Sequence, residues 1–338
     1  MLKRLLKLFI ILIISIISFE IFLRYSPFSN GISPVEYDKD IGMWHKREFE
    51  NYLIKECYKT KYKFDTEGRV LSNYRLDKSK KDIILLGDSQ VEALMVENDK
   101  VMHNSLYKEI DARYNVLNYG LSGTGPAQQY QIFNKKINLS NVHTIVHFIF
   151  LENDLNDSDP QSFTSANRPK VFIKFDDLEN YKVISPRPYD VKEKIRDFLG
   201  HFELYVYVKK SFYYYSSLFK KENKKIVENI EKKSYKLKNE EYKWRQLEGS
   251  IYQINQKVKD LKINYKIIIY SAYEFNSNYI EKRERLERFL KTQEIESLNI
   301  VPFLQNLALE KKISFSCDGH WNSNTHQNIG RYLKEKLF

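Results

Sequence analysis

From residue 81 onward, short apolar runs alternate with stretches that have the spacing of amphipathic helices. Short runs rich in Ile, Val and Leu are typical of strands buried on both faces, as in a parallel sheet. The expected strands are residues 82–86, 115–118, 144–150, 266–270 and 299–301, and the expected helices include residues 101–110 and 281–291. This alternation predicts an α/β fold in which helices cover both faces of the sheet.

Polar residues follow these expected strands near the points where the strands end. The segments concerned are Gly87-Asp88-Ser89, the glycine-rich residues 119–125, Glu152-Asn153-Asp154 and, close to the C-terminus, residues 317–322. Loops at the carboxyl ends of parallel strands meet in one crevice. We therefore expect a serine, a glycine-rich turn, an asparagine and an Asp–His pair at one edge of the sheet, an inventory that fits acyl transfer through a serine.

The chemistry assigns a role to each of these residues. Ser89 is the candidate nucleophile and His320 the candidate base, because a serine hydroxyl is weakly nucleophilic until a base takes its proton. Asp318 lies two residues before His320, and in an extended segment such residues point to the same side, so its carboxylate can orient the imidazole. The candidate oxyanion donors are the backbone N–H groups of Ser89 and Gly123 and the side-chain amide of Asn153.

Four segments resemble the conserved blocks of the SGNH (GDSL) serine hydrolase superfamily. They read "GDSQ", "NYGLSGTG", "LENDLND" and "DGHWN", and they occur in the family's order over roughly residues 81–338. The resemblance implies a flavodoxin-like, three-layer α/β/α fold with a parallel sheet. It also implies that Ser89, Gly123, Asn153 and His320 are the catalytic residues, with Asp318 completing the triad.

Two departures from the family pattern stand out. Gln90 replaces the usual Leu, which we expect to change the pocket more than the chemistry. The last block reads D-x-H instead of D-x-x-H, with Trp321 after the histidine. This form is similar to the last block of membrane-linked SGNH proteins that acetylate or deacetylate surface polysaccharides, and the segment "RPKVFI" after the third block adds to that similarity.

Each of these residues also has a simpler interpretation. Ser89 and Glu92 have the spacing of a helix capping box, and Asn153 followed by Asp154 is also typical of a turn. We favour catalysis because the four segments occur together. We expect His147, inside a strand, to be a core residue, and His326 to lie on the terminal helix rather than to share a metal with His320.

The glycines of segment 119–125 do not have the G-x-G-x-x-G order, so dinucleotide binding is not expected. Neither a metal nor an organic cofactor is needed for the expected chemistry. The net charge of +11 fits an anionic polymer or an anionic membrane surface. Because the lysines are spread along the chain and form no familiar motif, no nucleic-acid partner is expected.

The N-terminus is apolar enough to span a membrane. Residues 8–19 are apolar apart from two serines, Glu20 interrupts the run, and residues 21–23 resume it. Lys3, Arg4 and Lys7 precede the run, so we expect residues 1–24 to be a single-pass anchor with its N-terminus in the cytoplasm and the body outside. A cleaved signal peptide and a buried globular helix are the alternatives, although no small-x-small cleavage site follows the run.

The remaining chain divides into an expected lead-in, residues 25–80, and a hydrolase-like domain, residues 81–338, with an insertion around residues 176–262. Residues 25 to about 74 of the lead-in, rich in aromatic and charged residues, are expected to be irregular. Residues 176–215 are interpreted as a surface loop with a packed aromatic patch, or alternatively as a substrate groove. Residues 224–261 are expected to form a long helix. Its apolar positions have heptad spacing, and we favour packing on the sheet over a coiled coil; they are Trp244, Leu247, Ile251, Ile254, Val258 and Leu261.

The two cysteines, Cys57 and Cys317, are too few for a zinc site or a disulfide framework. They could pair in an oxidising compartment, but we favour free, buried thiols. The expected function is a membrane-anchored SGNH-type esterase that acts on O-acyl groups of a cell-surface glycan. One alternative is an O-acetyltransferase that modifies an extracytoplasmic polysaccharide with a membrane acyl-donor protein. The other is a non-catalytic carbohydrate-binding protein with the same fold.

Overall fold

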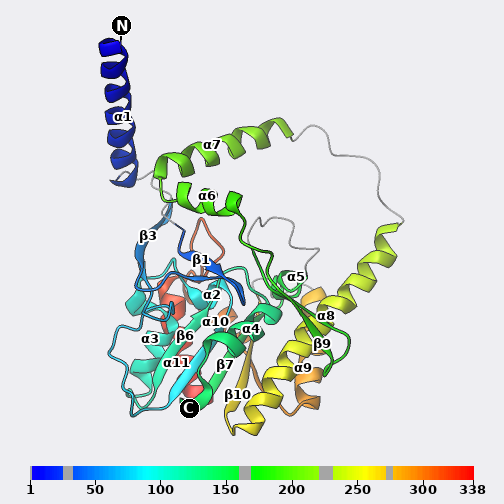
Figure 1. The fold of residues 1–338 in the computed structure, drawn as a ribbon. Coiled ribbons are helices and arrows are strands. Elements are labelled where there is room, and N and C mark those ends of the chain that lie inside the picture. Colours follow the sequence, from blue (N-terminus) through cyan, green and yellow to red (C-terminus); the bar gives the residue numbers. More distant parts are fainter. Residues whose placement is uncertain (1, 26–32, 160–168, 221–230, 272–276) are drawn as a thin grey trace.

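A five-stranded parallel sheet forms the centre of the fold (Figure 1). The computed structural model describes residues 2–25, 33–159, 169–220, 231–271 and 277–338. The strands are β5 (Asp82–Gly87), β6 (Asn115–Gly120), β7 (Val142–Phe150), β10 (Asn264–Tyr270) and β11 (Glu296–Asn299). Their spatial order, β11-β10-β7-β5-β6, places the first of the five between the second and the third, as in the flavodoxin-like doubly wound fold.

Helices cover both faces of this sheet. Alternate residues of a strand point to opposite faces, so Ile84 and Leu86 join one apolar cluster while Ile83 and Leu85 join the other. The first cluster is completed by α4 (Pro126–Lys136), α8 (Glu231–Asp260) and α9 (Ser277–Thr292). The second is completed by α3 (Met102–Glu109), α10 (Val301–Glu310) and α11 (Ser323–Leu337). The predicted three-layer α/β/α class is confirmed.

Four of the five expected strands lie within observed strands, and the fifth is misplaced. Residues 299–301 were expected to be extended, but helix α10 begins at Val301 and carries Pro302 in its first turn. The strand β11 lies earlier and pairs with β10 from Glu296 to Asn299. The residues of β11 are exposed or half-buried, so this strand has no continuous apolar run by which to recognise it.

The long helix packs on the sheet, as predicted from its heptad spacing. Trp244, Leu247, Ile251, Ile254 and Val258 are buried in the first apolar cluster. Leu261 lies beyond the last residue of α8 and is exposed. Residues 224–230 of the expected helix lie outside the described part of the chain.

The lead-in is not irregular, which corrects the sequence interpretation. It contains two antiparallel hairpins, β1 (Val35–Asp38) with β2 (Gly42–His45) and β3 (Glu50–Lys55) with β4 (Tyr58–Lys63). In β4, Tyr58, Thr60 and Tyr62 alternate with lysines, which is the period of a half-buried strand. The high charge of this segment obscured that alternation.

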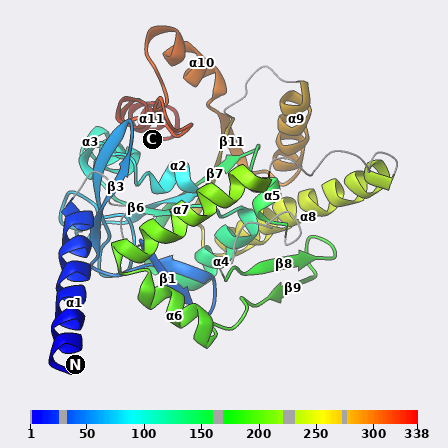
Figure 2. The same ribbon diagram turned by 90° about the horizontal axis from the view of Figure 1, so that it is seen from above.

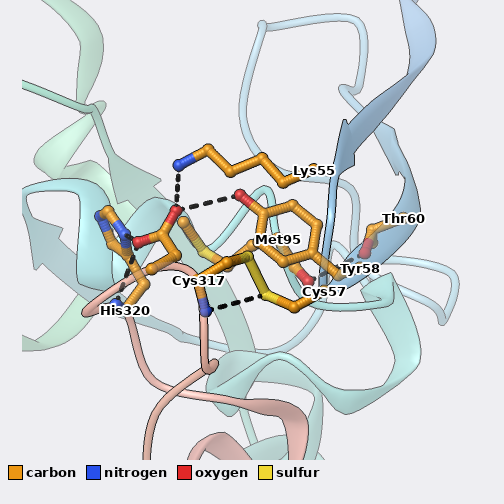
Figure 3. Close-up of a disulfide and its surroundings, with 8 residues drawn as sticks. Lys55, Cys57, Tyr58, Thr60, Met95, Cys317 and His320 are labelled. Carbon is orange, nitrogen blue, oxygen red and sulfur yellow. Dashed lines mark hydrogen bonds and ion pairs between the residues drawn. A yellow bond between two sulfur atoms is a disulfide. The ribbon is translucent and has the colours of Figure 1, made fainter. Parts of the chain in front are cut away.

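The two cysteines form a disulfide, which also corrects the expectation of free thiols. Cys57 lies in the turn of the β3–β4 hairpin, and Cys317 lies in the loop before α11, with a Cα–Cα distance of 5.8 Å (Figure 3). The residues are 260 positions apart in the sequence. Only the folded position of the lead-in brings them together.

The expected insertion is largely regular. Just before it, β8 (Phe172–Phe175) pairs with its first strand, β9 (Tyr181–Ile184), and its described part continues with α6 (Val191–Leu199), α7 (Glu203–Lys220) and α8. The aromatic run was expected to be packed, but Phe212 and Tyr215 are exposed on α7. The side chains of the two tyrosines between them lie outside the described residues.

The N-terminal helix α1 (Leu2–Tyr25) projects from the domain (Figures 1 and 2). Within the described residues it is the one helix long and apolar enough to cross a membrane, with a mean hydropathy of 2.6 over a window of 18 residues, and a signal sequence has the same character. The short elements are α2 (Ser89–Glu92), α5 (Asp154–Asp157), and the 3₁₀ turns η1 (Asn98–Lys100) and η2 (Leu139–Asn141).

Candidate active site

Ser89 lies where the central strand β5 turns sharply into α2. The strand ends at Gly87, and Asp88 caps the helix by accepting a hydrogen bond from the backbone N–H of Gln90 at 2.9 Å. A Cβ at position 87 would lie 2.5 Å from a methyl group of Val91, so the turn requires glycine there. The capping-box interpretation of Ser89 is wrong, because the N-cap is Asp88.

Three side chains form a hydrogen-bonded chain at this turn. Ser89 Oγ lies 2.9 Å from His320 Nε2, and His320 Nδ1 is hydrogen-bonded to Asp318 Oδ1. A carboxylate only accepts, so Nδ1 carries the hydrogen and Nε2 is left to accept from the serine hydroxyl. This is the geometry in which a histidine removes the proton of a serine nucleophile.

The β3–β4 hairpin holds the carboxylate of this chain. Asp318 Oδ2 accepts hydrogen bonds from Lys55 Nζ and, at 3.1 Å, from Tyr58 Oη (Figure 3). Burial disfavours the charged form of Asp318, but the bonds from Lys55 and His320 outweigh it and lower the pKa of Asp318 well below its usual value. Asp318 therefore stays ionised beside the imidazole.

Lys55 and Tyr58 were missed from the sequence. Both lie in a segment interpreted as irregular, and more than 250 residues separate each of them from Asp318, which is their common partner. The one signal that could have found them is the cysteine pair, because a disulfide between Cys57 and Cys317 implies that their neighbours are also close.

The glycine-rich loop follows β6 and leaves the same edge of the sheet as Ser89, since Gly87 pairs with Gly120 in the β5–β6 register. Gly123 has a φ of +72°, which favours glycine, and a Cβ there would meet nothing within 4 Å. Conformation rather than crowding by the described residues therefore selects glycine at this position.

A buried network fixes this loop. Glu92 accepts hydrogen bonds from the backbone N–H of Ser122, at 3.2 Å, and from its hydroxyl. The other oxygen of Glu92 lies 2.6 Å from His45 Nε2, and both of these side chains are buried. The network connects the helix of Ser89, the lead-in and the turn of Gly123. No sequence pattern predicted that His45 would bind Glu92 and so help to hold this loop.

Asn153 lies beside the serine turn. It precedes α5, and its Nδ2 donates to Asp88 Oδ2 at 3.4 Å, while Tyr270 Oη donates to the other oxygen of Asp88 at 2.8 Å. Burial raises the pKa of Asp88, although these bonds oppose it. Burial together with the charge of Asp88 raises the pKa of Asp154 well above its usual value. The amide of Asn153 is thus positioned through the residue next to Ser89.

We expected Gln90 to change the pocket. Its side chain instead supports the histidine loop, the segment of residues 317–322 that carries His320. The Gln90 side chain is buried, and its Oε1 accepts the backbone N–H of Trp321 at 3.0 Å. Trp321 in turn packs against Tyr270, with 4.8 Å between ring centroids. Gln90, which stands where the GDSL motif has Leu, therefore connects α2 to the loop that carries His320.

A small cavity adjoins Gly123. Its volume is about 90 Å³. The lead-in, the glycine-rich loop, α4 and the segment before β8 supply its walls, which are Val35, Ile41, Met43, Leu121, Ser122, Gly123, Thr124, Gln128, Pro169 and Lys170. Burial lowers the pKa of Lys170 to about 8, despite the opposing charge of Asp157.

The remaining histidines belong to the core. His147 is buried in β7 and contacts Tyr265 Oη at 2.7 Å and Gln129 Oε1 at 2.6 Å, which confirms the expected core role. Burial lowers its pKa to about 3. His326 is buried on α11, as expected from its position. The described residues contain no group of three or more His, Cys, Asp and Glu side chains placed to hold a metal ion.

No family model and no curated protein matches this sequence. The most similar solved structures include a member of the lipolytic protein G-D-S-L family from Veillonella parvula, with 14% identity, 76% of this chain and 97% of that chain covered, and a TM-score of 0.37. The psychrotrophic esterase EstA from Pseudoalteromonas sp. has 10% identity, with 75% and 93% covered and a TM-score of 0.41. An acetylxylan esterase from Geobacillus stearothermophilus has 10% identity, with 76% and 94% covered and a TM-score of 0.42. In its motifs, strand order and Ser–His–Asp geometry, the chain is similar to the SGNH (GDSL) serine hydrolases.

Proposed function

We propose that this chain is a membrane-anchored serine esterase of the SGNH type. The observation that carries the proposal is the hydrogen-bonded chain from Ser89 Oγ through His320 to Asp318. Ser89 Oγ attacks the carbonyl carbon of an ester while its proton moves to His320 Nε2, and the ionised Asp318 stabilises the imidazolium. The alcohol leaves with that proton, and water then attacks the acyl group on Ser89 and releases the acid.

The oxyanion that forms during both steps needs hydrogen-bond donors. We assign the backbone N–H groups of Ser89 and Gly123 and the side-chain amide of Asn153 to this role. The support for Asn153 is its bond to Asp88, which directs the amide to the serine turn. The support for Gly123 is that no atom of the other described residues lies within 4 Å of the position that a Cβ would take there. Each donor of this kind typically contributes about 3–4 kcal/mol to the transition state.

The proposed acyl group is short. The cavity beside Gly123 measures about 90 Å³, whereas pockets for drug-sized ligands measure about 300–1,000 Å³. An acetyl group would fit this space and a long fatty chain would not, although Gly123 is the one proposed catalytic residue that lines it. The proposed alcohol part of the ester is a hydroxyl group of a surface glycan. The net charge of +11 attracts acidic polymers, and the proposed anchor keeps the site near the membrane.

Hydrolysis is favoured over transfer by the openness of the site. The side chain of His320 is 28% exposed and Ser89 is half-buried, so water reaches the acyl-enzyme. An acetyltransferase has to exclude water or hold a sugar hydroxyl at high effective concentration. The intact triad argues against a protein that only binds carbohydrate.

One assay tests the enzyme and separates its alternatives. The full-length protein in detergent is given an acetyl ester, with and without an oligosaccharide acceptor, and the acetyl group is followed by mass spectrometry. A fluorophosphonate probe reports the nucleophile in parallel. We expect wild type to release acetate and to be labelled, and Ser89→Ala to lose labelling and at least about 1,000-fold in turnover.

The matched control is Ser140→Ala, since Ser140 is an exposed serine in η2, outside the site. This variant should keep labelling and turnover. Labelling that persists in Ser89→Ala would reject the assignment of the nucleophile. Acetylated oligosaccharide that forms with wild type and not with Ser89→Ala would establish the transferase instead of the esterase.

A further inference from the structure

Helices α6 and α7 carry exposed apolar faces. On α6 the residues are Val191, Ile195 and Phe198, and on α7 they are Val208, Phe212 and Tyr215. Each set has the spacing i, i+4 and i+7, which places its members on one face of the helix. All six side chains are between 54% and 70% exposed. We refer to these two sets as the apolar faces of α6 and α7.

Hydrogen bonds attach the start of α7 to the end of α1. The backbone N–H groups of Glu203 and Leu204 both donate to the carboxylate of Glu20 at 2.9 Å. Arg24 donates to the carbonyl of His201 at 2.8 Å and to Glu20 at 2.9 Å. Glu20, the residue that interrupts the apolar run of α1, therefore caps a second helix.

This attachment places both helices beside the end of α1 that joins the domain. Figures 1 and 2, which are perpendicular views, both show α7 starting next to that end of α1 with α6 nearby. If α1 crosses a bilayer, its last turns lie at the level of the headgroups. The apolar faces of α6 and α7 are then at the depth where amphipathic helices bind membranes.

The charges next to the apolar faces suit the same location. On α6, Lys192 and Lys194 are exposed and flank the apolar positions, and Arg196 follows. Basic residues beside an apolar helix face are typical of helices that lie on anionic lipid. The exposed tyrosine and phenylalanine of α7 are residue types that favour the interface.

We infer that α6 and α7 lie in the membrane interface beside α1, with their apolar faces at the boundary between headgroups and acyl chains. The occupant of these faces is the lipid surface itself. The domain is then held against the bilayer by three helices rather than tethered by one. This inference rests on the proposed membrane anchoring of α1, and the esterase chemistry is independent of it.

Spin-label depth measurements on the full-length chain test the inference. Phe198→Cys and Val208→Cys are each spin-labelled and reconstituted into vesicles of phosphatidylcholine and phosphatidylglycerol, with the native disulfide intact. Ile14→Cys in the middle of α1 is the reference for the bilayer core. Leu309→Cys is the matched control, since Leu309 is 87% exposed on α10.

Collisions with oxygen and with a water-soluble nickel complex then give the depth of each label. Labels at positions 198 and 208 should lie about 5–10 Å into the boundary region, at least tenfold less accessible to nickel than the label at position 309. If the labels at positions 198, 208 and 309 are equally accessible to nickel while the label at position 14 lies in the bilayer core, the inference is wrong, but α1 still spans the membrane. Exposure of position 14 to water would overturn the anchor as well.

A protein partner gives a different signal. Labels at 198 and 208 that are shielded from both oxygen and nickel would show that a second copy of the chain covers these faces, and this would also overturn the inference. Turnover of the acetyl ester is measured on every sample. Because none of the four substitutions touches the triad, unchanged turnover shows that the domain is folded.

Discussion

Asp318 is the residue through which the histidine loop contacts the lead-in. Its two oxygens accept hydrogen bonds from His320, Lys55 and Tyr58. Its side chain is 5% exposed, whereas that of Lys55 is 49% exposed. A buried carboxylate is stable only when it is paired and hydrogen-bonded. Lys55 and Tyr58 therefore maintain the charge on which His320 depends.

Replacement of Lys55 tests this dependence through pH. The folded pKa of Asp318 lies below its unfolded value of about 3.9, so its contribution to stability is present above that pH and is lost as the pH falls toward the folded pKa. Lys55→Met raises the folded pKa. The variant should lose about 1 kcal/mol or less at pH 7, because half of Lys55 is in solvent.

Urea unfolding at pH 7 and at about pH 1.5 measures the effect. The difference between wild type and Lys55→Met should shrink at the lower pH, where Asp318 becomes protonated in the folded wild type as well. Lys59→Met is the matched control, since Lys59 is an exposed lysine on the same hairpin. A difference that is the same size at both pH values would contradict the role of Lys55.

At the level of elements, the sequence predicted the sheet and the loops that follow its strands better than it predicted the lead-in. Ser89, Gly123 and Asn153 follow β5, β6 and β7, three strands that were predicted because continuous apolar runs mark buried parallel strands. The hairpins of the lead-in have no such runs. Their contacts with Asp318 and Glu92 depend on tertiary packing, which local patterns do not encode.

The disulfide joins the β3–β4 hairpin to the histidine loop, next to Lys55 and Asp318 (Figure 3). Cys57→Ser combined with Cys317→Ser should lower the free energy of unfolding by about 2–5 kcal/mol. It should also lower kcat, because Asp318 is then held less firmly. Differential scanning calorimetry and ester turnover, with and without a reductant, measure both effects.

The double variant is its own control for the reductant. Reduction should lower the Tm and kcat of wild type to those of the double variant and should leave the double variant unchanged. If wild type and the double variant have the same kcat, the disulfide does not help to position Asp318.

On the scale of the whole molecule, the order of the strands gathers residues from the two ends of the chain at one edge of the sheet. Ser89 and His320 are 231 residues apart in sequence and 2.9 Å apart in space. The proposed anchor α1, at the opposite end of the chain from His320, would determine in which compartment this assembly works. The basic residues Lys3, Arg4 and Lys7 predict that the body lies outside the cytoplasm.

A reporter fused after Phe338 tests this topology. Alkaline phosphatase, which is active only outside the cytoplasm, should be active in the fusion. A fluorescent protein that folds only in the cytoplasm should be dark at the same position. Replacing Lys3, Arg4 and Lys7 with glutamine should weaken the orientation and reduce phosphatase activity several-fold. A fluorescent fusion with inactive phosphatase would reverse the predicted topology.

The position of the histidine loop late in the chain has a consequence for the timing of activity. During synthesis Ser89 emerges more than 200 residues before its base. Until residues 317–320 have been made, the nascent chain has neither a base for its serine nor a cross-link for its hairpin. If the body is exported during synthesis, as proposed, such a chain would be inert inside the cell, and the order of synthesis alone would keep the proposed esterase activity out of the cytoplasm.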